Sequence, residues 1–334
     1  MKILGIESTC DETSCAIVED GFNILSNVVS SQIDIHAQFG GVVPELACRR
    51  HIETITPVLQ EALTQASCTL DDIDLIGVAK GPGLLGALLI GINFAKALSL
   101  ATDIPLIGIN HIEAHLYAPI MDCLMSVQYP ALGVILSGGH TQFVHIKEPN
   151  HYVPIGQTLD DAMGEAFDKV AKMLHLPYPG GPEIERLAKK GDPKRFAFKG
   201  GKVKNRPFDL SFSGLKTSVL YTLFGQNTNK TLPLSKEDLC DAAASFQHTA
   251  VQIIIDKLHA ILNTFEVKSL IFGGGVTCNT YLKENIFKHF SLPIFWPTKT
   301  LSLDNAAMIA GLSFAKFQAK TYASNLSAQT RIPF

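Results

Sequence analysis

Two histidines four residues apart, His111 and His115, are the strongest candidates for chemistry in the sequence. Side chains at positions i and i+4 of a helix lie on one face, so both imidazoles can reach a single metal ion. A third ligand has to come from elsewhere in the chain, and Asp304 is our candidate. Surface histidines often show the same spacing. The position of this pair directly after a predicted strand modestly favours a metal site.

Glu113 lies between the two histidines and raises the question of a metallopeptidase. In the zincin motif the catalytic Glu directly follows the first His. Here it comes two positions after His111, roughly 200° around a helix of about 3.6 residues per turn. We expect its carboxylate to point away from the metal, which makes a peptidase the weakest of the candidate functions.

Three turns have compositions suited to binding phosphate. Residues 7–14 (ESTCDETS) and residues 137–141 (SGGHT) each lie between two predicted strands and offer hydroxyl and backbone N–H groups. Glycine in such turns allows backbone amides to approach an anion closely. Residues 273–275 (GGG) precede a predicted helix, whose N-terminus favours negative charge. A lone Gly-Gly turn is usually only a hairpin, but three turns at equivalent places favour a nucleotide site.

Two further stretches have a functional and a plain interpretation. Asp168, in a predicted helix, could accept hydrogen bonds from ribose hydroxyls or could simply pair with Lys172 at i+4. The segment 192–209 lacks periodicity and is predicted to be a long surface loop. It interleaves basic residues with aromatic ones, which suits an RNA backbone with stacked bases but is also typical of a solvated loop. These residues are Arg195, Lys199, Lys202, Lys204 and Arg206, with Phe196, Phe198 and Phe208.

The predicted elements form two similar series that would position these groups. Each series begins with a strand, a hairpin and a returning strand, followed by alternating helices and strands. The strands are residues 2–6, 15–19, 22–29, 75–79 and 106–109, then 132–136, 142–146, 152–156 and 270–272. Helices are predicted over residues 49–66, 84–101, 161–174, 183–190 and 236–265, with a final one opened by Asp304. The repetition predicts two α/β lobes with a cleft between them, with two unrelated α/β units as the alternative.

Composition limits the class of protein. With 46% hydrophobic and 18% charged residues in 334, the chain is expected to be a compact globular enzyme. A net charge of −3 provides no global basic field, so any RNA contact must be local. Seven scattered cysteines and the absence of a signal peptide predict reduced thiols in a cytoplasmic protein. The apolar stretch 84–101 is predicted to be a buried helix rather than a membrane span.

Taken in order, the motifs resemble those of one family over essentially the whole chain. They are GIESTCDET (5–13), GGVVPE (40–45), GPGL (81–84), HIEAH (111–115), SGGH (137–140), EAFDK (165–169), YPGGP (178–182), FSGLK (212–216), GGGV (273–276) with Asn279, and Asp304-Asn305. The chain resembles the TsaD family of tRNA N6-adenosine threonylcarbamoyltransferases, once described as O-sialoglycoprotein endopeptidases. The resemblance implies a duplicated actin-like or sugar-kinase-like ATPase fold (ASKHA). Residues 1–108 and about 305–334 would form one lobe, and about 109–304 the other, with metal and nucleotide in the central cleft.

The resemblance also implies roles for individual residues. His111, His115 and Asp304 would hold one iron or zinc ion, and Asp11 and Glu12 would be the catalytic acidic pair. The adenylate of ATP or threonylcarbamoyl-AMP would contact Ile135, Leu136, Ser137, Gly138, Gly139, Asp168, Gly181, Glu185 and Asn279. Position 185 is often Asp in the family, so Glu185 would reach the ribose through a longer side chain. The segment before Asp304 is a little shorter than usual, so its assignment depends on the DNAAM motif (304–308).

The implied reaction transfers a threonylcarbamoyl group from threonylcarbamoyl-AMP to the exocyclic amine of a tRNA adenine. This adenine is at position 37, next to the anticodon, in tRNAs that read codons beginning with A, and AMP is released. No Ser-His-Asp arrangement or activated cysteine is evident, so we expect direct transfer without a covalent enzyme intermediate. The alternatives, a sugar-kinase-like ATPase or an ATP-dependent scaffold, would not need the histidine pair. The implied partners are tRNA, a TsaB-like paralogue and a TsaE-like ATPase, with no membrane.

Overall fold

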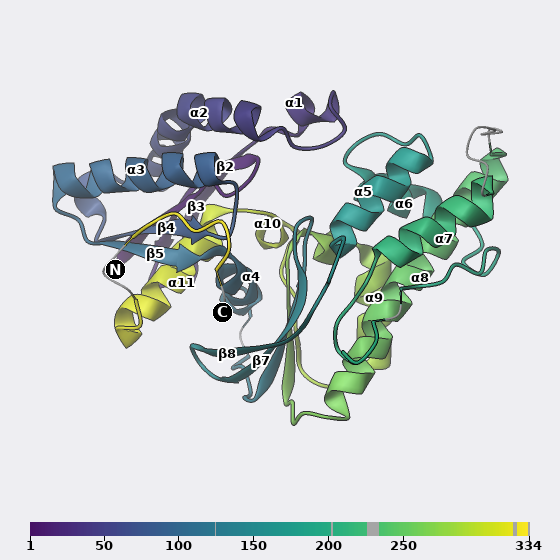
Figure 1. The fold of residues 1–334 in the computed structure, drawn as a ribbon. Coiled ribbons are helices and arrows are strands. Elements are labelled where there is room, and N and C mark those ends of the chain that lie inside the picture. The colour runs from purple at the N-terminus through teal and green to yellow at the C-terminus, as the bar shows by residue number, and fades with distance from the viewer. Residues whose placement is uncertain (124, 202, 226–233, 323–325, 333–334) are drawn as a thin grey trace. The chain divides into compact units, whose positions relative to one another are not determined.

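The computed structural model describes residues 1–123, 125–201, 203–225, 234–322 and 326–332, and the chain divides into two compact units (Figure 1). Unit 1 comprises Met1–Val127 and Phe295–Phe334, and unit 2 comprises Gln128–Ile294. The chain therefore returns at its C-terminal end to the unit in which it starts. The lobe boundaries predicted near residues 108 and 305 both fall within unit 1.

Unit 1 is built on a five-stranded mixed sheet with the strand order β3-β2-β1-β4-β5. Antiparallel pairing joins β1 to β2 and β2 to β3, whereas β1, β4 and β5 run parallel. The strands are β1 (Lys2–Glu7), β2 (Glu12–Glu19), β3 (Asn23–Ser31), β4 (Leu75–Gly81) and β5 (Leu106–Asn110). The central strands are almost entirely buried, as expected for a sheet with helices on both faces.

Helices cover both faces of this sheet. On one face α2 (Pro44–Gln65) and α3 (Leu85–Thr102) pack against strand residues that include Leu4. On the other face α4 (His111–Met121) and α11 (Ala306–Ala319) pack against residues that include Ile3, its neighbour in β1. Successive residues of a strand thus point to the two opposite faces of the sheet and pack in the core on each face. Three short helices complete the unit: α1 (Ile33–Ala37), η1 (Leu70–Asp72) and α10 (Lys299–Ser302).

The close approach of α11 to the sheet requires glycine in β1. A Cβ atom at Gly5 would overlap the carbonyl oxygen of Ala306 and lie 2.9 Å from the backbone nitrogen of Ala310. Glycine therefore lets the start of α11 lie directly on β1. This contact brings the segment that contains Asp304 to the carboxyl end of the strand.

The helix α3 is less buried than predicted from its composition. Only 28% of its most apolar window is buried. Leu88 and Ile92 face the core, whereas Leu85, Leu89 and Leu100 are exposed. The prediction of a buried helix was wrong for the outer face, because a uniformly apolar segment does not indicate which face is covered. By length and composition alone α3 could cross a membrane, but helices that pack on the core of a globular protein pass the same test.

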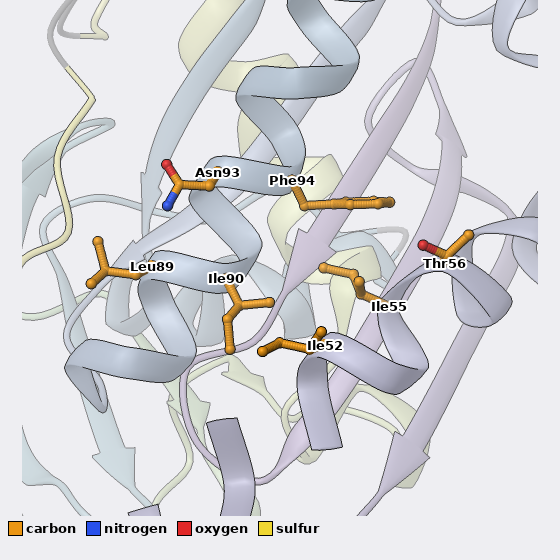
Figure 2. Close-up of a pocket in the computed structure, with 7 residues that line it drawn as sticks. All are labelled: Ile52, Ile55, Thr56, Leu89, Ile90, Asn93 and Phe94. Carbon is orange, nitrogen blue, oxygen red and sulfur yellow. The ribbon is translucent and has the colours of Figure 1, made fainter. Parts of the chain in front are cut away.

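The exposed face of α3 and the neighbouring α2 border a shallow apolar groove (Figure 2). Its lining residues are Ile52, Ile55, Thr56, Leu89, Ile90, Asn93 and Phe94. Ile52 is 65% exposed, which is unusual for a large apolar side chain in the middle of a helix. The groove thus exposes apolar surface at the edge of the core, to which Ile55 belongs.

Unit 2 repeats the sheet of unit 1. Its strand order is β10-β9-β6-β7-β8, with β6, β7 and β8 antiparallel and β6 and β9 parallel. The strands are β6 (Ala131–Leu136), β7 (Thr141–Glu148), β8 (His151–Gln157), β9 (Ser269–Gly273) and β10 (Ile294–Phe295). Read from the antiparallel edge, both sheets follow the order third, second, first, fourth and fifth strand. The predicted α/β class with a doubled strand pattern is therefore confirmed.

The helices of unit 2 gather around the long α8 (Lys236–Leu262) (Figure 1). The others are α5 (Met163–Met173), α6 (Gly180–Ala188), α7 (Ser213–Phe224), η2 (Gly275–Cys278) and α9 (Thr280–His289). The sequence did not predict α7, because its apolar residues show almost no helical periodicity and only Leu215 and Val219 are buried. The loop predicted over residues 192–209 contains no helix or strand in its described part.

Candidate functional site

Two histidines and one aspartate come together beyond the carboxyl end of β5. The side chain of Asn110, the last residue of β5, accepts hydrogen bonds from two amides in the first turn of α4 and so caps the helix. This cap starts α4 at His111, and His115 follows one turn later on the same face. Nε2 of His115 lies 3.1 Å from Oδ1 of Asp304, and Nε2 of His111 lies 3.6 Å from the same oxygen. One ligand atom from each of the three residues lies within 4.8 Å of the others.

The donor set of these three residues fits a divalent metal ion. Nδ1 of His111 lies 2.9 Å from a carboxylate oxygen of Glu7 and donates its hydrogen there, which leaves the lone pair of Nε2 directed towards Asp304. While Nε2 carries no proton, it and the Asp304 oxygen are two acceptor atoms 3.6 Å apart, and a cation between them would relieve their repulsion. Metal–ligand bonds of about 2.0–2.2 Å in tetrahedral geometry separate ligand atoms by about 3.3–3.6 Å. The two separations from Oδ1 of Asp304, 3.1 and 3.6 Å, are close to this range, and the three ligand atoms lie within 4.8 Å of one another. His115 is fully buried, and burial lowers the pKa of its imidazole, which keeps it in the neutral form that binds metals.

When no metal is bound, the charges around His111 favour a proton on its imidazole in place of the cation. Burial alone would lower the pKa of His111, but the carboxylates of Glu7 and Asp304 outweigh it and raise the pKa to about 9. The imidazole of the metal-free protein is therefore protonated at neutral pH. A positive charge at this position is thus favoured by the surrounding protein.

Glu7 orients His111, a role that sequence analysis missed. The side chain is fully buried at the end of β1, and its second oxygen accepts a hydrogen bond of 2.6 Å from the backbone nitrogen of Thr9. Histidine ligands usually donate their second N–H to such a carboxylate, which fixes the tautomer and the ring direction. The signal in the sequence was a glutamate at the end of an apolar strand, but only the tertiary pairing with His111 reveals its partner.

The acidic pair Asp11 and Glu12 lies in the same turn between β1 and β2. Asp11 is 8% exposed, and Glu12 begins β2, where its side chain accepts a hydrogen bond from the hydroxyl of Ser31. Burial, together with the charges of Asp304 and Asp11, raises the pKa of Glu12 to about 10. Several carboxylates in one turn disfavour a lone anion, and binding of phosphate by residues 7–14 stays a prediction. The turn is suited to a cation or to a group that loses a proton.

Glu113 points away from the three candidate ligands, as its position on the helix predicts. Its carboxylate forms an ion pair with Lys316 of α11, with a distance of 2.5 Å between Nζ and Oε2. It therefore cannot act as the general base beside a metal held by His111 and His115. This arrangement removes the local support for a metallopeptidase.

In unit 2, the turn between β6 and β7 contains no acidic residue, in contrast to the turn between β1 and β2. Its backbone closes through a hydrogen bond of 2.8 Å from the amide of Ser137 to the carbonyl of His140, and the amide of His140 donates to the Ser137 hydroxyl. Gly138 and Gly139 are exposed, and a Cβ atom at either would meet nothing within 4 Å. The turn therefore offers open backbone where an anion can approach. Of the residues predicted to contact adenylate, Ile135 is buried in β6, so only its backbone could take part.

Neighbouring elements meet this turn at the carboxyl ends of β6 and β9. The amide of Gly164, which follows the start of α5, donates to the carbonyl of Ser137. Gly274, at the end of β9, has φ +94°, and a Cβ there would lie 2.5 Å from the carbonyl oxygen of Leu136. Only glycine allows this approach with that backbone conformation. The ends of β6 and β9 and the start of α5 thus lie around one turn.

The remaining predicted adenylate ligands form a chain of contacts between helix starts. Asp168 accepts a hydrogen bond of 2.7 Å from the amide of Gly180 at the beginning of α6. Next to it, Gly181 has open space where a Cβ would lie. In the same helix, Glu185 accepts hydrogen bonds from the backbone nitrogen and the hydroxyl of Thr280. These contacts bring Asp168, Gly181 and Glu185 towards the start of α9.

Asn279 is fixed at that helix start by both ends of its side-chain amide. Its Oδ1 accepts a hydrogen bond from the amide of Leu282 and caps α9. Its Nδ2 donates to Oε1 of the buried Gln247 in α8, at 2.8 Å. Gln247 is thus a neighbour of the site that sequence analysis missed, because nothing in the sequence links it to Asn279.

The aromatic residues of the basic segment are less available than the sequence suggested. Phe198 is 7% exposed and stacks on Phe196, and the guanidinium of Arg195 lies 5.5 Å from the centre of the Phe196 ring. Phe208 packs against Phe265. Base stacking on these rings is therefore restricted. The basic side chains Lys194, Arg195, Lys199, Lys204 and Arg206 are exposed, and Lys202 lies outside the described residues.

Comparison with known proteins decides the family. The sequence profile of TsaD, described as tRNA N6-adenosine threonylcarbamoyltransferase, matches residues 23–311. A protein of that name from Protochlamydia amoebophila (strain UWE25) is 58% identical over 338 residues, which cover 100% of this chain and 98% of the relative. This chain belongs to the TsaD family. A second relative, from Chlamydia trachomatis serovar A, is 49% identical over 97% of this chain and 95% of its own length. The predicted family, function and enzyme class, a transferase acting on tRNA, are confirmed.

Solved structures share the fold of the family at low sequence identity. Full-length HypF in its phosphate- and nucleotide-bound form has a TM-score of 0.61 and 14% identity, covering 98% of this chain and 47% of HypF. The (R)-2-hydroxyglutaryl-CoA dehydratase component A of Acidaminococcus fermentans has a TM-score of 0.53 and 13% identity, covering 95% of this chain and 98% of its own. Such identities show the fold alone. That fold is the actin-like ATPase fold, as predicted.

Proposed function

We propose that this protein transfers the threonylcarbamoyl group of threonylcarbamoyl-AMP to the exocyclic amine of adenine 37 in tRNAs that read codons beginning with A. The amine nitrogen bonds to the carbamoyl carbon, the bond from that carbon to the phosphate oxygen breaks, and AMP leaves. Membership of the TsaD family along the full chain carries this proposal. The group of His111, His115 and Asp304, in which both histidines are buried, supports it, since the alternative ATPase or scaffold functions have no use for such a group.

His111, His115 and Asp304 would hold the metal ion. When bound, the ion would polarise an oxygen of the threonylcarbamoyl group, so that a weakly nucleophilic aromatic amine can attack the carbon. Two imidazoles and one carboxylate suit both zinc and non-haem iron, and these two metals are our candidates. The carboxylate of Glu7 keeps the His111 ring directed at Asp304.

Asp11 and Glu12 would act on the reacting amine. The amine gains a positive charge as it bonds to the carbamoyl carbon and must lose a proton. Asp11 is the group that we propose to accept this proton, with Glu12 beside it positioning the amine. The nearly buried setting of Asp11 supports this role, because it limits the water that could compete with the amine for the carboxylate.

Unit 2 would hold the adenylate. The open backbone of Ser137–Gly139 and Gly181 would contact the phosphate, where the amides stabilise the charge that develops on the leaving AMP. Asp168, Glu185 and Asn279 would contact the nucleoside. The two hydroxyl groups of a ribose can donate hydrogen bonds to a carboxylate, and we therefore assign Asp168 and Glu185 to the sugar.

The tRNA backbone would contact the exposed basic side chains along residues 189–206. Lys190, Lys194, Arg195, Lys199 and Lys204 are exposed, and no carboxylate in the described part of the chain forms an ion pair with them. Cations without partners are available for phosphates. Because the aromatic residues of this segment are packed, the contact would be mainly electrostatic and independent of base identity.

A TsaB-like paralogue and a TsaE-like ATPase are the proposed protein partners in the cytoplasm. The apolar groove between α2 and α3 supports a protein partner, because it exposes large side chains such as Ile52 and Leu89 (Figure 2). Exposed apolar surfaces of this kind commonly become interfaces. The site residues described above all lie outside this groove.

The deciding experiment measures transfer directly. Purified protein is incubated with synthetic threonylcarbamoyl-AMP and unmodified tRNA, with and without the partner proteins, and modified adenosine is quantified by mass spectrometry. The variant His111→Ala/His115→Ala is expected to lose product, whereas the control His151→Ala, at an exposed histidine in β8, should retain it. Product that survives the double change would exclude a role for the metal, and ATP consumption without any product would favour the ATPase or scaffold.

A further inference from the structure

An ion pair in unit 1 has no part in the proposed reaction. Nζ of Lys316 lies 2.5 Å from Oε2 of Glu113, and the two side chains are only 13% and 11% exposed. Within the described residues this oxygen makes no hydrogen bond, so the ammonium group approaches it off the direction that a hydrogen bond requires. The two side chains are therefore held together chiefly by their opposite charges.

Stability alone is a poor explanation for this pair. Removing two charges from water is costly, and apolar side chains of similar size in such a position are often neutral or stabilising. An ion pair has one property that apolar contacts lack, since it favours a single alignment of the two elements that it joins. The question is therefore which alignment this pair selects.

The pair joins α4, which contains the two histidines, to α11, which follows directly after Asp304. On α4, His111 and His115 lie on the face towards Asp304, and Glu113 lies on the face towards α11. A rotation of α4 about its own axis would move both imidazoles away from Asp304. The alignment of these two faces therefore sets the geometry of the histidine-aspartate group.

Part of the contact between α4 and α11 does little to resist such a rotation. Near the histidines small side chains meet, because Ala114 and Ala118 of α4 share a core cluster with Ala307 and Ala310 of α11. Farther along α4, Tyr117 and Met121 close on Gly311, and the ion pair acts together with this contact. Short side chains form shallow ridges and grooves, which specify the relative rotation of two helices only weakly. A charged contact on this interface supplies the alignment that the alanines do not.

We propose that Glu113 is a positioning residue of the metal site, and that its pairing with Lys316 holds α4 at the rotation in which His111 and His115 face Asp304. Glu113 does not touch the metal or the substrate. It acts through the helix that contains the ligands. This inference rests on the metal site of the proposed function, and its test is chosen to separate the two.

The test measures metal binding rather than catalysis. Zinc affinity is determined by competition with a chelating dye in metal-free protein, for the unaltered chain and for Glu113→Gln and Lys316→Met. Removing residues that orient metal ligands typically weakens binding roughly 10–100-fold, and we expect about tenfold for each of these variants, since they act indirectly. The absorption spectrum of bound cobalt provides a second readout, and its bands should shift because the ligand geometry changes.

Two further variants separate positioning from a general loss of stability. The exchange Glu113→Lys with Lys316→Glu restores opposite charges across the same helices and should recover most of the zinc affinity. Lys216→Met removes a comparable partly buried ion pair, with Asp161 in unit 2, and should leave zinc affinity unchanged. Thermal unfolding of each variant, followed by circular dichroism, verifies that the protein measured is folded.

The outcomes distinguish this inference from the metal site itself. If the unaltered chain binds no metal, the assignment of the histidine-aspartate group is wrong and this inference falls with it. If the unaltered chain binds zinc and Glu113→Gln binds equally tightly with an unchanged cobalt spectrum, only the positioning role is refuted. Equal weakening by Lys216→Met would also refute it, because the effect would then follow from stability alone.

Discussion

The turn after the first strand of each sheet differs sharply between the two units. In unit 1 the turn between β1 and β2 contains the buried Glu7 and Asp11 and the partly exposed Glu12. In unit 2 the turn between β6 and β7 contains Gly138 and Gly139, which are exposed and uncharged. The strands before these turns occupy the same place in two sheets of the same order. The two turns thus represent one structural position with two chemistries.

This difference separates what the fold determines from what the individual residues determine. In α/β sheets ligands bind beyond the carboxyl ends of the strands, where the strand order reverses, and both turns lie at such a point. The topology therefore provides the location of a site but not the sign of its ligand. Carboxylates and histidines make the turn of unit 1 favourable for a cation, whereas open backbone amides make that of unit 2 favourable for an anion.

Loss of a metal ligand should separate the two chemistries most strongly. Asp304→Ala leaves two imidazoles without the shared carboxylate and should weaken metal binding by more than about 100-fold, beyond the loss seen for residues that merely orient ligands. Binding of a non-hydrolysable ATP analogue should remain unchanged, because its proposed ligands lie in unit 2. Metal content by mass spectrometry and nucleotide affinity by calorimetry provide the two measurements. A parallel loss of nucleotide affinity would contradict the division between the turns.

Glu7→Gln should have the next largest effect. The amide keeps the size of the side chain but removes the negative charge that accepts the hydrogen of His111 Nδ1. Metal affinity should fall roughly 10–100-fold, as for other partners of histidine ligands. The pKa of His111, raised to about 9 by Glu7 and Asp304, should fall in the metal-free variant, and NMR titration of the imidazole would show it. An unchanged titration would mean that Glu7 does not orient this ring.

The sequence predicted the elements of these sites better than the contacts within them. The spacing of His111 and His115 and the glycines of the second turn were visible because they depend on neighbouring residues in one element. Glu7 was missed as the partner of His111, since they are 104 positions apart and meet only when β1 and β5 join the same sheet. The contact between Asn279 and Gln247 was missed for the same reason.

The prediction of helices and of their buried faces failed where the apolar residues show little periodicity. The helix α7 has apolar residues on all sides and few buried ones, so the sequence contains no amphipathic signal for it. The same property led to the prediction of a buried helix over residues 84–101, which is wrong for the outer face of α3. In both cases the tertiary environment, rather than the local pattern, decides which side chains are covered.

The second turn can be tested by adding a single methyl group. Gly139→Ala places a Cβ in open space, so the free energy of unfolding should stay within about 0.5 kcal/mol of its original value. The methyl group would nevertheless hinder the approach of a phosphate to the backbone, and nucleotide affinity should fall about tenfold, or about 1.4 kcal/mol. Gly274→Ala is the opposite control, since strain at φ +94° and the overlap with the Leu136 carbonyl should destabilise the fold. Unchanged nucleotide affinity in Gly139→Ala would place the phosphate elsewhere.

Asp161→Asn should have the smallest effect and concerns the charges within unit 2. Asp161 forms ion pairs with Lys169 at 2.6 Å and Lys216 at 2.8 Å. Burial alone would raise the pKa of Asp161, but the two ammonium groups outweigh it and lower the pKa below its ordinary value of 3.8. The variant should lower the free energy of unfolding at pH 7 by about 1 kcal/mol, as for partly exposed ion pairs.

The stability lost in Asp161→Asn should depend on pH, and the direction of this dependence follows from the lowered pKa of Asp161. Because the pKa of Asp161 is lower in the folded protein than in the unfolded chain, its contribution is complete above pH 3.8 and disappears as the pH falls through the folded value. Urea unfolding should therefore show a constant difference between the variant and the unaltered chain from pH 7 to about 5, and a shrinking difference below about 4. Glu183→Gln, in an exposed pair with Arg186, should show little difference at any pH. A difference for Asp161→Asn that grew on acidification would mean that its carboxylate is destabilised, not stabilised, by its surroundings.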